Sequence, residues 1–323
     1  MSMARKIRKA VDLRAVLSST GFRVFVMIVV LYVVSGILEP NYFSGEHLMT
    51  ILVISCFLGI ICVGQTMIIL TGGADLSVAF TVTFSACVFA ETFTSTGNGL
   101  ISFLATIGAA LIIGLLKGLG VAILGITAMV MTLATNSILM STTFIYTKGV
   151  LKGTSPSFLT TLAKGSIFGI RYVVLVWIVV GIIVTFLLKK TIFGRKIYAI
   201  GSSLRVSRLS AIDTKFTLVC VYIIATLMMS FAGVLLIGYI GFPNLTMGDG
   251  YQLISIAAVV IGGTSIMGGH GSYLGTMGGV IIIYLIQTIL TILHIADAGK
   301  QIVNGLIILL VLFAYGRGKK ITA

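Results

Sequence analysis

Residues 198–212, YAIGSSLRVSRLSAI, form a polar and basic stretch that lies between two long apolar runs. The run before it, 173–188, has sixteen residues without a charge, and the run after it, 216–240, has twenty-five. Apolar runs of this kind are typical of helices that cross a lipid bilayer, and a soluble fold has no use for two of them. The stretch is therefore predicted to be a helical segment at the membrane surface, between two spans.

The composition of the whole chain indicates the same class of protein. Of its 323 residues, 58% are hydrophobic and 9% are charged, and the mean hydropathy is +1.17. The chain has 38 glycines and only 3 prolines, which suits helices that pack closely through small residues in lipid. The sequence thus predicts an all-α polytopic membrane protein, not a soluble enzyme.

The apolar runs predict about ten transmembrane helices, six before the polar stretch and four after it. Some of these runs are shorter than the roughly 20 residues that a bilayer requires. The predicted spans are 22–38, 50–70, 76–93, 100–116, 119–145, 172–188, 216–240, 252–267, 275–293 and 301–315.

The net charge of +14 is interpreted here as a signal of topology and not of nucleic-acid binding. Most of the 22 lysine and arginine residues fall within 5–23, 189–215 and 317–320. Because basic residues favour the cytoplasmic side, these three groups are predicted to be cytoplasmic, and so are both ends of the chain. The predicted organisation is a basic N-terminal segment (1–21), one transmembrane domain (22–315) with a cytoplasmic loop at about 189–215, and a C-terminal tail (316–323).

The first apolar run is predicted to remain as an anchor, because a long basic lead precedes it and no small-x-small cleavage pattern follows it. The four cysteines, at 56, 62, 87 and 220, all lie inside apolar runs. Their spacing is not that of metal ligands, and their positions do not favour disulfides. They are predicted to be core residues.

Residues 262–279, GGTSIMGGHGSYLGTMGG, contain eight glycines in eighteen positions. This run is not a nucleotide-binding loop, because the chain contains no G-x-x-x-x-G-K-[ST]. Helix breaking and close packing are predicted instead. If the protein moves a solute uphill, the energy must come from an ion gradient or from a separate ATPase. Asp75, Glu91 and Lys117 all lie at predicted helix ends, which favours the ATPase, because ion-coupled carriers keep ionisable groups within the bilayer.

Polar residues inside predicted helices are the candidates for a solute path, since a polar group that faces lipid has no hydrogen-bond partner. A link between two helices is the alternative function for each of them. Asp75 and Ser77, in TGGADLS (71–77), are expected to cap the third span or to shape the cytoplasmic exit. The path candidates are Gln65, Thr132, Asn136, Gln287 and Asn304. Thr132 lies one helical turn before Asn136 and is expected to share its face.

Four motifs in order give the chain a family resemblance. They are TMIILTGGADLSV (66–78), FGRKIYAIGSS (193–203), RLSAI (208–212) and GYQLISIAAVVIGGTSIMGGHGSYLGT (250–276). Together they resemble the ribose-type monosaccharide permeases of bacterial ABC importers, over roughly residues 45–315. The last motif is the strongest part of the resemblance.

The resemblance implies the permease fold of vitamin B12 importers, in the bacterial inner membrane, as a homodimer or with a related second permease. The permease would have no catalytic site and no cofactor of its own. ATP and Mg²⁺ would bind to separate ATPase subunits, and an extracytoplasmic binding protein would deliver the solute. Residues 201–212 resemble the coupling helix that contacts the ATPase, with Gly201, Ser203, Arg205, Arg208 and Ser210 as the candidate contacts.

The binding protein would meet the longest external loop, which is basic and has no Asp or Glu. Lys148, Lys152 and Lys164 are the candidate contacts in that loop. The implied solute is a monosaccharide, which includes pentoses, hexoses and furanose sugars. A nucleoside or a signalling sugar is the alternative within the family, and an ATP-independent carrier or a membrane scaffold is the alternative outside it.

The chain departs from the family pattern where solute and subunit contacts are expected. Lys117 precedes Gly118 where members usually have Asn-Gly, and Thr127 and Ala128 stand where a proline is common. Ala74 replaces the usual isoleucine of GGIDLS. Arg205 and Val206 stand where small residues are common. These departures leave the solute and the partner permease open.

Overall fold

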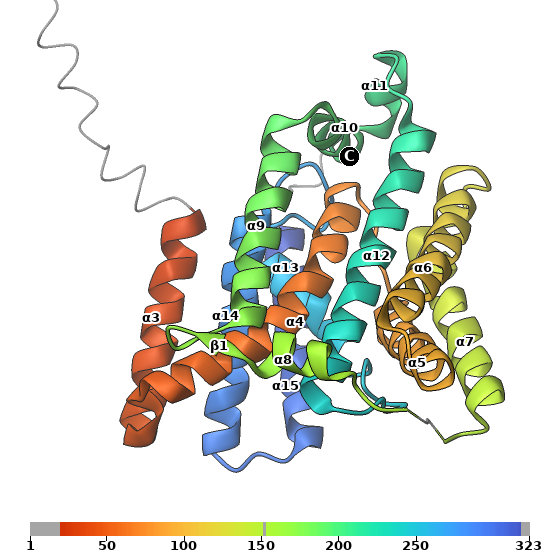
Figure 1. Ribbon diagram of the computed structural model, residues 1–323. Coiled ribbons are helices and arrows are strands. Elements are labelled where there is room, and N and C mark those ends of the chain that lie inside the picture. Colours follow the sequence, from red (N-terminus) through yellow and green to blue (C-terminus); the bar gives the residue numbers. More distant parts are fainter. Residues whose placement is uncertain (1–19, 151–152, 318–323) are drawn as a thin grey trace, which may run out of the picture.

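In the computed structural model, which describes residues 20–150 and 153–317, almost every apolar run forms a helix (Figure 1). Eight of the described helices are long and apolar enough to cross a membrane. This confirms the predicted all-α polytopic class. The eight are α3 (Thr20–Leu38), α4 (Gly45–Leu70), α5 (Val78–Thr96), α6 (Gly99–Ala122), α7 (Ala128–Thr147), α9 (Tyr172–Lys190), α12 (Thr214–Ile240) and α14 (Tyr273–Ile292).

Two further helices occupy the remaining predicted spans. Helix α13 (Tyr251–Ile261) is apolar but has only 11 residues, and α15 (Asp297–Arg317) follows α14. The short elements are η1 (Pro40–Phe43), α8 (Ser157–Lys164), the two-stranded antiparallel hairpin β1 (Ser166–Ile167) and β2 (Ile170–Arg171), α10 (Ile192–Ser202) and α11 (Leu204–Leu209).

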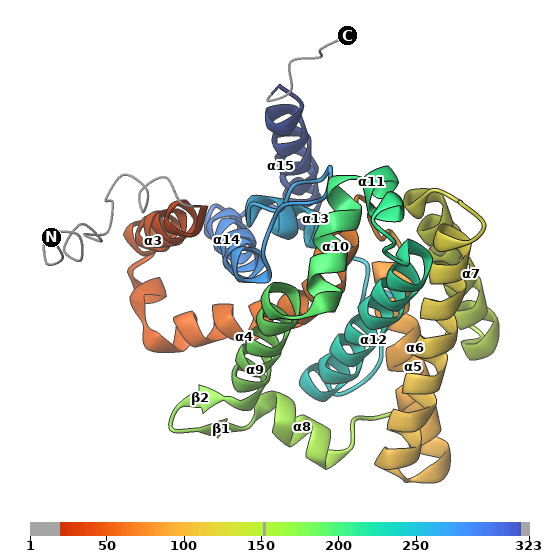
Figure 2. The ribbon, with the colours of Figure 1, turned by 90° about the horizontal axis from the view of Figure 1, so that it is seen from above.

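Helices α4 and α12 form the centre of the molecule. The most apolar window of α4 is 89% buried and that of α12 is 67% buried, whereas the windows of α3 and α7 are each 17% buried. Figure 2 shows α3 and α7 at opposite edges, with α4 and α12 between them. Exposed apolar side chains on the outer helices suit a lipid environment or a partner subunit.

Buried hydrogen bonds join this centre to its neighbours. The Trp177 indole on α9 donates to the Tyr273 hydroxyl on α14 (3.1 Å), which in turn donates to the Gly59 carbonyl on α4 (2.7 Å). Ser85 on α5 donates to Ser230 on α12 (2.7 Å). In an apolar medium a polar side chain needs such a partner, so these bonds fix which helices meet.

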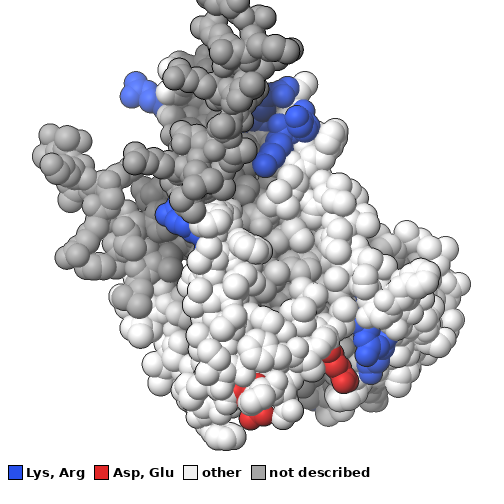
Figure 3. Space-filling model, turned by 90° about the vertical axis from the view of Figure 1, so that its left-hand side faces the viewer, with Lys and Arg blue, Asp and Glu red and all other residues white. Residues whose placement is uncertain are grey.

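The short elements separate onto two faces. Helices α10 and α11 lie at the top of Figure 1, and α8 and the β hairpin lie at the bottom. In Figure 3 most basic side chains lie toward the upper edge, and the lower part shows the acidic groups with one further basic group beside them. The assignment of the basic groups to the cytoplasmic side stays a prediction.

One predicted boundary is wrong in an informative way. The span predicted at 119–145 starts too early, because residues up to Ala122 belong to α6 and α7 begins at Ala128. The turn between them contains Gly125 with φ 71° and no proline. The boundary was placed at Lys117 because a charge normally ends a span, but Lys117 lies inside α6 and is fully buried.

The other boundaries differ by smaller amounts. Helix α4 begins at Gly45 and not at residue 50, because the Ser44 side chain caps it by accepting from the His47 N–H (3.2 Å). Helix α15 begins at Asp297, four residues before the predicted start. Helix α13 ends at Ile261, and the span predicted to reach residue 267 continues as a glycine-rich loop.

The glycine-rich run breaks a helix and packs closely, as predicted. Residues 262–272 form the loop between α13 and α14, in which Gly263, Gly268, Gly269 and Gly271 have positive φ. The Gly269 N–H donates to the Leu70 carbonyl at the end of α4 (2.9 Å). Helix α13 alone is too short to cross a bilayer, so the glycine-rich loop and α13 together make this crossing.

Candidate functional site

Residues 71–77 form the α4–α5 linker, a non-helical break between two buried helices. Helix α4 ends at Leu70, Gly72 follows with φ 86°, and α5 begins at Val78. Buried non-helical backbone leaves peptide groups without partners in their own segment, so other helices must supply those partners. Asp75 and Ser77 of the linker are both 0% exposed.

Asp75 binds within its own segment and to α6. Its Oδ1 accepts hydrogen bonds from the Ser77 N–H (2.7 Å) and the Ser77 hydroxyl (2.6 Å), and its Oδ2 lies 2.8 Å from the Lys117 Nζ. Lys117 also donates to the Ser77 hydroxyl (3.0 Å). Asp75 accepts a backbone N–H, as expected for a cap, but Ser77 occupies the N-cap position of α5.

The buried pair corrects the prediction about charges. Asp75 lies between two spans, as predicted, but Lys117 lies inside α6, and both side chains are 0% exposed among the helices. Ionisable groups are thus present within the buried region, and the charge inventory no longer favours an ATPase over an ion gradient. A charge pair this deeply buried persists only when each partner neutralises the other.

Both backbone polar groups of Leu76 form hydrogen bonds with side chains of other helices. Its N–H donates to the Thr132 hydroxyl on α7 (2.9 Å), and its carbonyl accepts from the Gln252 side-chain amide on α13 (2.9 Å). One turn along α7, Asn136 Oδ1 accepts from the Phe80 N–H in the first turn of α5 (3.1 Å). Thr132 and Asn136 share a face of α7, as predicted, and both hold the region of the break.

Gln65 lies on α4 and is 0% exposed, and neither its Oε1 nor its Nε2 has a hydrogen-bond partner among the described residues. A buried amide without partners is costly, about 1–3 kcal/mol per lost hydrogen bond. Such a group is a reasonable contact for water or a solute. Its role as a path residue stays a prediction.

The remaining two path candidates do not join this group. Gln287 is half-buried on α14, and Asn304 is 7% exposed on α15 with its Oδ1 unpartnered in the described part of the chain. Neither side chain makes a hydrogen bond to the α4–α5 linker in the part of the chain that the structure describes. The structure therefore brings Thr132 and Asn136 to one place and leaves Gln287 and Asn304 elsewhere.

The α10–α11 segment, residues 192–209, is helical, as predicted for the polar stretch, and rests on the end of α4 and on the glycine-rich loop. A Cβ placed on Gly201 would lie 1.8 Å from the Leu70 carbonyl oxygen and 2.4 Å from the Gly269 nitrogen. The Tyr198 hydroxyl donates to the Gly271 carbonyl (2.9 Å), and burial raises the pKa of this phenol, which keeps it a donor. The segment thus touches the end of α4 and the glycine-rich loop directly.

The outer side of the segment is free to meet a partner. Arg205 and Arg208 are exposed, and neither makes an ion pair with another described residue. Val206 and Leu209 beside them are 59% and 81% exposed. Ser203 caps α11 by accepting from the Val206 N–H (3.3 Å), and Ser210 follows its last turn. Exposed arginine and apolar residues together are typical of protein interfaces.

A cavity of about 360 Å³ connects the α10–α11 segment to the α4–α5 linker. Arg208 and Leu204 form one wall, and the Thr71–Gly73 turn and Tyr222 form another. The turn between α6 and α7 closes the third side. A displacement of α11 would therefore alter the space next to the linker.

The predicted contacts on the opposite face are only partly described. Lys148 caps α7 in a left-handed conformation (φ 52°), and Lys164 is the last residue of α8. Lys152 lies outside the described residues. Lys164 lines a second cavity, of about 440 Å³, together with residues of α4, β2 and α12.

Three residues of the site were missed from the sequence. Gln252 was passed over because it lies at the edge of its predicted span, although a glutamine that starts an apolar run is a usable signal. Lys117 was noted as a charge at a predicted helix end and as a departure from the family pattern, but not as a site residue. Tyr222 resembles any core aromatic residue, and nothing in the sequence marks it as a wall of the cavity.

Known proteins resemble this chain over most of its length. Residues 47–312 match the family described as branched-chain amino acid transport system / permease component. The ribose import permease protein RbsC of Escherichia coli K12 is 31% identical over 289 residues, which is 88% of this chain and 90% of that protein. No solved structure matches.

Two further relatives span similar lengths. The ribose import permease protein RbsC of Haemophilus influenzae is 30% identical over 296 residues, 90% of this chain and 92% of that protein. The autoinducer 2 import system permease protein LsrC of Salmonella paratyphi B is 31% identical over 291 residues, 90% of this chain and 84% of that protein.

Proposed function

The chain belongs to the family of transport-system permease components matched by residues 47–312, and on that premise we propose that it is the membrane subunit of an ATP-driven importer for a monosaccharide. It is a multi-pass membrane permease with eight spans by length and composition among its described residues. Relatives that cover most of its length are permeases for ribose and autoinducer 2. The proposal adds the energy source, the solute class and the partners.

The observation that carries the proposal is the contact of the α10–α11 segment with the end of α4 and with the glycine-rich loop. Gly201 approaches the Leu70 carbonyl so closely that no side chain fits between them. An ATPase that binds Arg205, Arg208 and Leu209 would push on the end of α4 and on the glycine-rich loop. Packed helices shift between discrete arrangements. A displacement of the α10–α11 segment would therefore be transmitted to the α4–α5 linker and not absorbed within the surface segment.

The permease supplies no bond-making chemistry in this scheme. The ATPase pair binds ATP and Mg²⁺, closes, and moves the two α10–α11 segments of a permease dimer. The central path then opens on one face and closes on the other. The second permease is another copy of this chain or a related one.

The path itself is proposed to pass the α4–α5 linker. Asp75 and Lys117 neutralise each other there, and the other side chains near the break are amides and hydroxyls, Thr132, Asn136 and Gln252. Neutral donors and acceptors suit a neutral, hydroxyl-bearing solute. Lys148, Lys152 and Lys164 would face the binding protein on the extracytoplasmic side, with both chain ends cytoplasmic.

A second function stays in view because of the buried pair. Asp75 and Lys117 are ionisable groups among membrane helices, which is also a feature of ion-coupled carriers. A carrier would transport without an ATPase. A nucleoside or a signalling sugar would leave the mechanism unchanged and alter only the solute.

The test is uptake of radiolabelled D-ribose, autoinducer 2 or L-leucine into proteoliposomes. The vesicles contain the permease with or without its ATPase, ATP and the binding protein. We expect uptake of a sugar only when all components are present. Uptake by the permease alone, driven by a pH or sodium gradient, would support the carrier and contradict the importer.

A further inference from the structure

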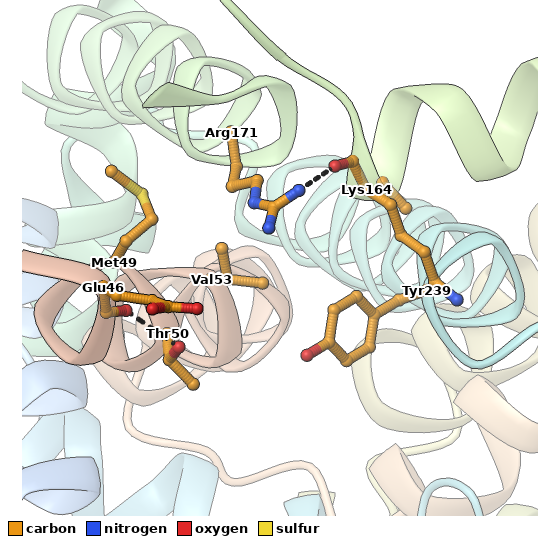
Figure 4. Close-up of a pocket in the computed structure, with 8 residues that line it drawn as sticks. Glu46, Met49, Thr50, Val53, Lys164, Arg171 and Tyr239 are labelled. Atoms are coloured by element: carbon orange, nitrogen blue, oxygen red, sulfur yellow. Dashed lines mark hydrogen bonds between the residues drawn. The ribbon is translucent and has the colours of Figure 1, made fainter. Parts of the chain in front are cut away.

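The cavity of about 440 Å³ lies on the face opposite the α10–α11 segment and has no role in the coupling scheme. It lies between the first turns of α4, the end of α8, strand β2 and the end of α12. Figure 4 shows polar ends of Glu46, Arg171 and Tyr239 directed toward a common space, with Val53 at its base. Met49 and Val53 supply an apolar wall.

The polar groups around this cavity are largely unused. The Glu46 carboxylate and the Tyr239 hydroxyl make no hydrogen bond to another described residue, and the only one from the Arg171 guanidinium goes to the Lys164 carbonyl. No ion pair joins Glu46 to Lys164 or Arg171 in the described structure, although all three line the same space. Opposite charges that stay apart around one cavity leave room for a guest.

Two of these groups, Tyr239 and Arg171, are held in position by the fold, whereas the Glu46 side chain is exposed. The Tyr239 ring packs against Phe57 on α4, with ring centroids 5.2 Å apart. The bond from Arg171 to the Lys164 carbonyl ties β2 to the end of α8. The Thr50 hydroxyl donates to the Glu46 carbonyl (3.0 Å), so Thr50 is committed to the first turns of α4. A guest would meet preformed groups, which reduces the entropy lost on binding.

The chemistry of these groups limits the class of guest. A carboxylate only accepts hydrogen bonds, a guanidinium only donates them, and a phenol does both. A simple anion would be opposed by Glu46, and a simple cation by Arg171 and Lys164. A neutral ring with several hydroxyls both donates and accepts on all sides.

From this arrangement we propose that the cavity is a low-affinity monosaccharide site, at which a sugar leaving the binding protein is held before it enters the membrane path. Glu46 accepts from two neighbouring hydroxyls, Arg171 donates to ring or hydroxyl oxygens, and Tyr239 contacts the remaining hydroxyl. The apolar C–H face of the sugar lies against Met49 and Val53. This inference rests on the proposed function as a monosaccharide importer.

The test measures sugar binding by the permease–ATPase complex in lipid nanodiscs, without the binding protein. D-Ribose is the probe, and saturation-transfer NMR reports its dissociation constant. We expect binding in the millimolar range, and roughly tenfold or greater weakening in Glu46→Gln and in Tyr239→Phe, because each removes one or more hydrogen bonds to the sugar. Lys300→Gln, a charge change at the start of α15 and outside the lining of this cavity, is the matched control and should leave the constant unchanged.

Three results would overturn the proposal. One is the absence of a ribose signal above that of empty nanodiscs in a complex that imports ribose when the binding protein is present. Another is equal binding by the wild type and the two variants. The third is a variant that changes only the concentration of binding protein needed for half-maximal uptake, which would make the cavity a docking site. Failure of the importer proposal is distinct, since that complex would import no sugar at all.

Discussion

Lys117 is the residue on which the interior of this permease depends most. Its ammonium group lies 2.8 Å from Asp75 and 3.0 Å from the Ser77 hydroxyl, and the side chains of Lys117 and Asp75 are fully buried. It therefore holds the α4–α5 linker against α6. Removing one member of a buried pair leaves the other charge uncompensated, which typically costs about 3–5 kcal/mol, whereas removing both often costs much less.

We expect Lys117→Met to lower the thermal stability of the detergent-solubilised permease markedly and Lys117→Met with Asp75→Asn to recover most of the loss. The fluorescence of the single tryptophan, Trp177, is a suitable signal, because this residue is buried between α9, α4 and α14. A stability of Lys117→Met equal to wild type, or a double variant no better than the single one, would show that the pair does not act as described.

Asn136 gives a second expectation at this scale, because its side chain accepts from the Phe80 N–H at the start of α5. Asn136→Leu should impair solute uptake while the protein still assembles with its partners, since the variant removes a polar group from the break and adds no charge. Thr142→Leu, an exposed change on the same helix, is the control. Normal uptake by Asn136→Leu would remove this residue from the path.

At the scale of elements, the α10–α11 segment connects the surface to the end of α4. Gly201 is the point of contact, since a Cβ there would lie 1.8 Å from the Leu70 carbonyl oxygen, and backbone cannot yield as a flexible side chain does. We expect Gly201→Ala to displace α10 and to reduce the stimulation of ATP hydrolysis by the loaded binding protein several-fold. Stimulation equal to wild type would show that this contact does not transmit movement.

Arg208 tests the outer side of the same element. It is exposed, lines the cavity beneath α11 and has no ion-pair partner in the described part of the chain. Arg208→Glu should uncouple stimulated ATP hydrolysis while the permease stays folded in the membrane, because the reversed charge repels the acidic partner that an arginine attracts. Lys300→Glu on the opposite face is the control. Retained coupling in Arg208→Glu would refute the docking assignment.

The elements also show what the sequence can predict. The apolar runs and the polar stretch 198–212 predicted the class of fold and the helical surface segment, because hydropathy and length are local properties. They misplaced the boundary between α6 and α7, since a lysine in an apolar run looks like the end of a span. Only its partner Asp75, forty-two residues earlier in the chain, makes Lys117 an interior residue. Pairings of that kind are set by tertiary packing, so single-sequence patterns do not reveal them.

The candidate site divides in the same way. Thr132 and Asn136 were predicted as one face of α7 from their spacing, and the structure places both against the break. Gln252 was missed, although its amide holds the Leu76 carbonyl from α13. No sequence spacing relates residues on helices that are distant along the chain, and therefore the linker's partners from α6 and α13 became visible only in the fold.

At the scale of the whole molecule, the proposed function assigns separate tasks to the two faces. One face carries α10 and α11 with exposed Arg205 and Arg208, and the other carries α8, the β hairpin and the cavity with Glu46 and Arg171. Between them, the buried helices α4 and α12 and the α4–α5 linker form the part that must change shape. An importer of this kind needs an energy source on the first face and a source of solute on the second.

The proposal that a separate ATPase drives this permease is tested most directly by affinity purification of the permease in mild detergent. The chains that copurify are then identified, and ATP hydrolysis is assayed. We expect an ATPase subunit that binds the wild type, is lost or uncoupled in Arg208→Glu, and is stimulated by a binding protein loaded with one sugar. A permease that purifies without any ATPase, and that still passes solute across vesicle membranes driven by an ion gradient, would contradict the central claim.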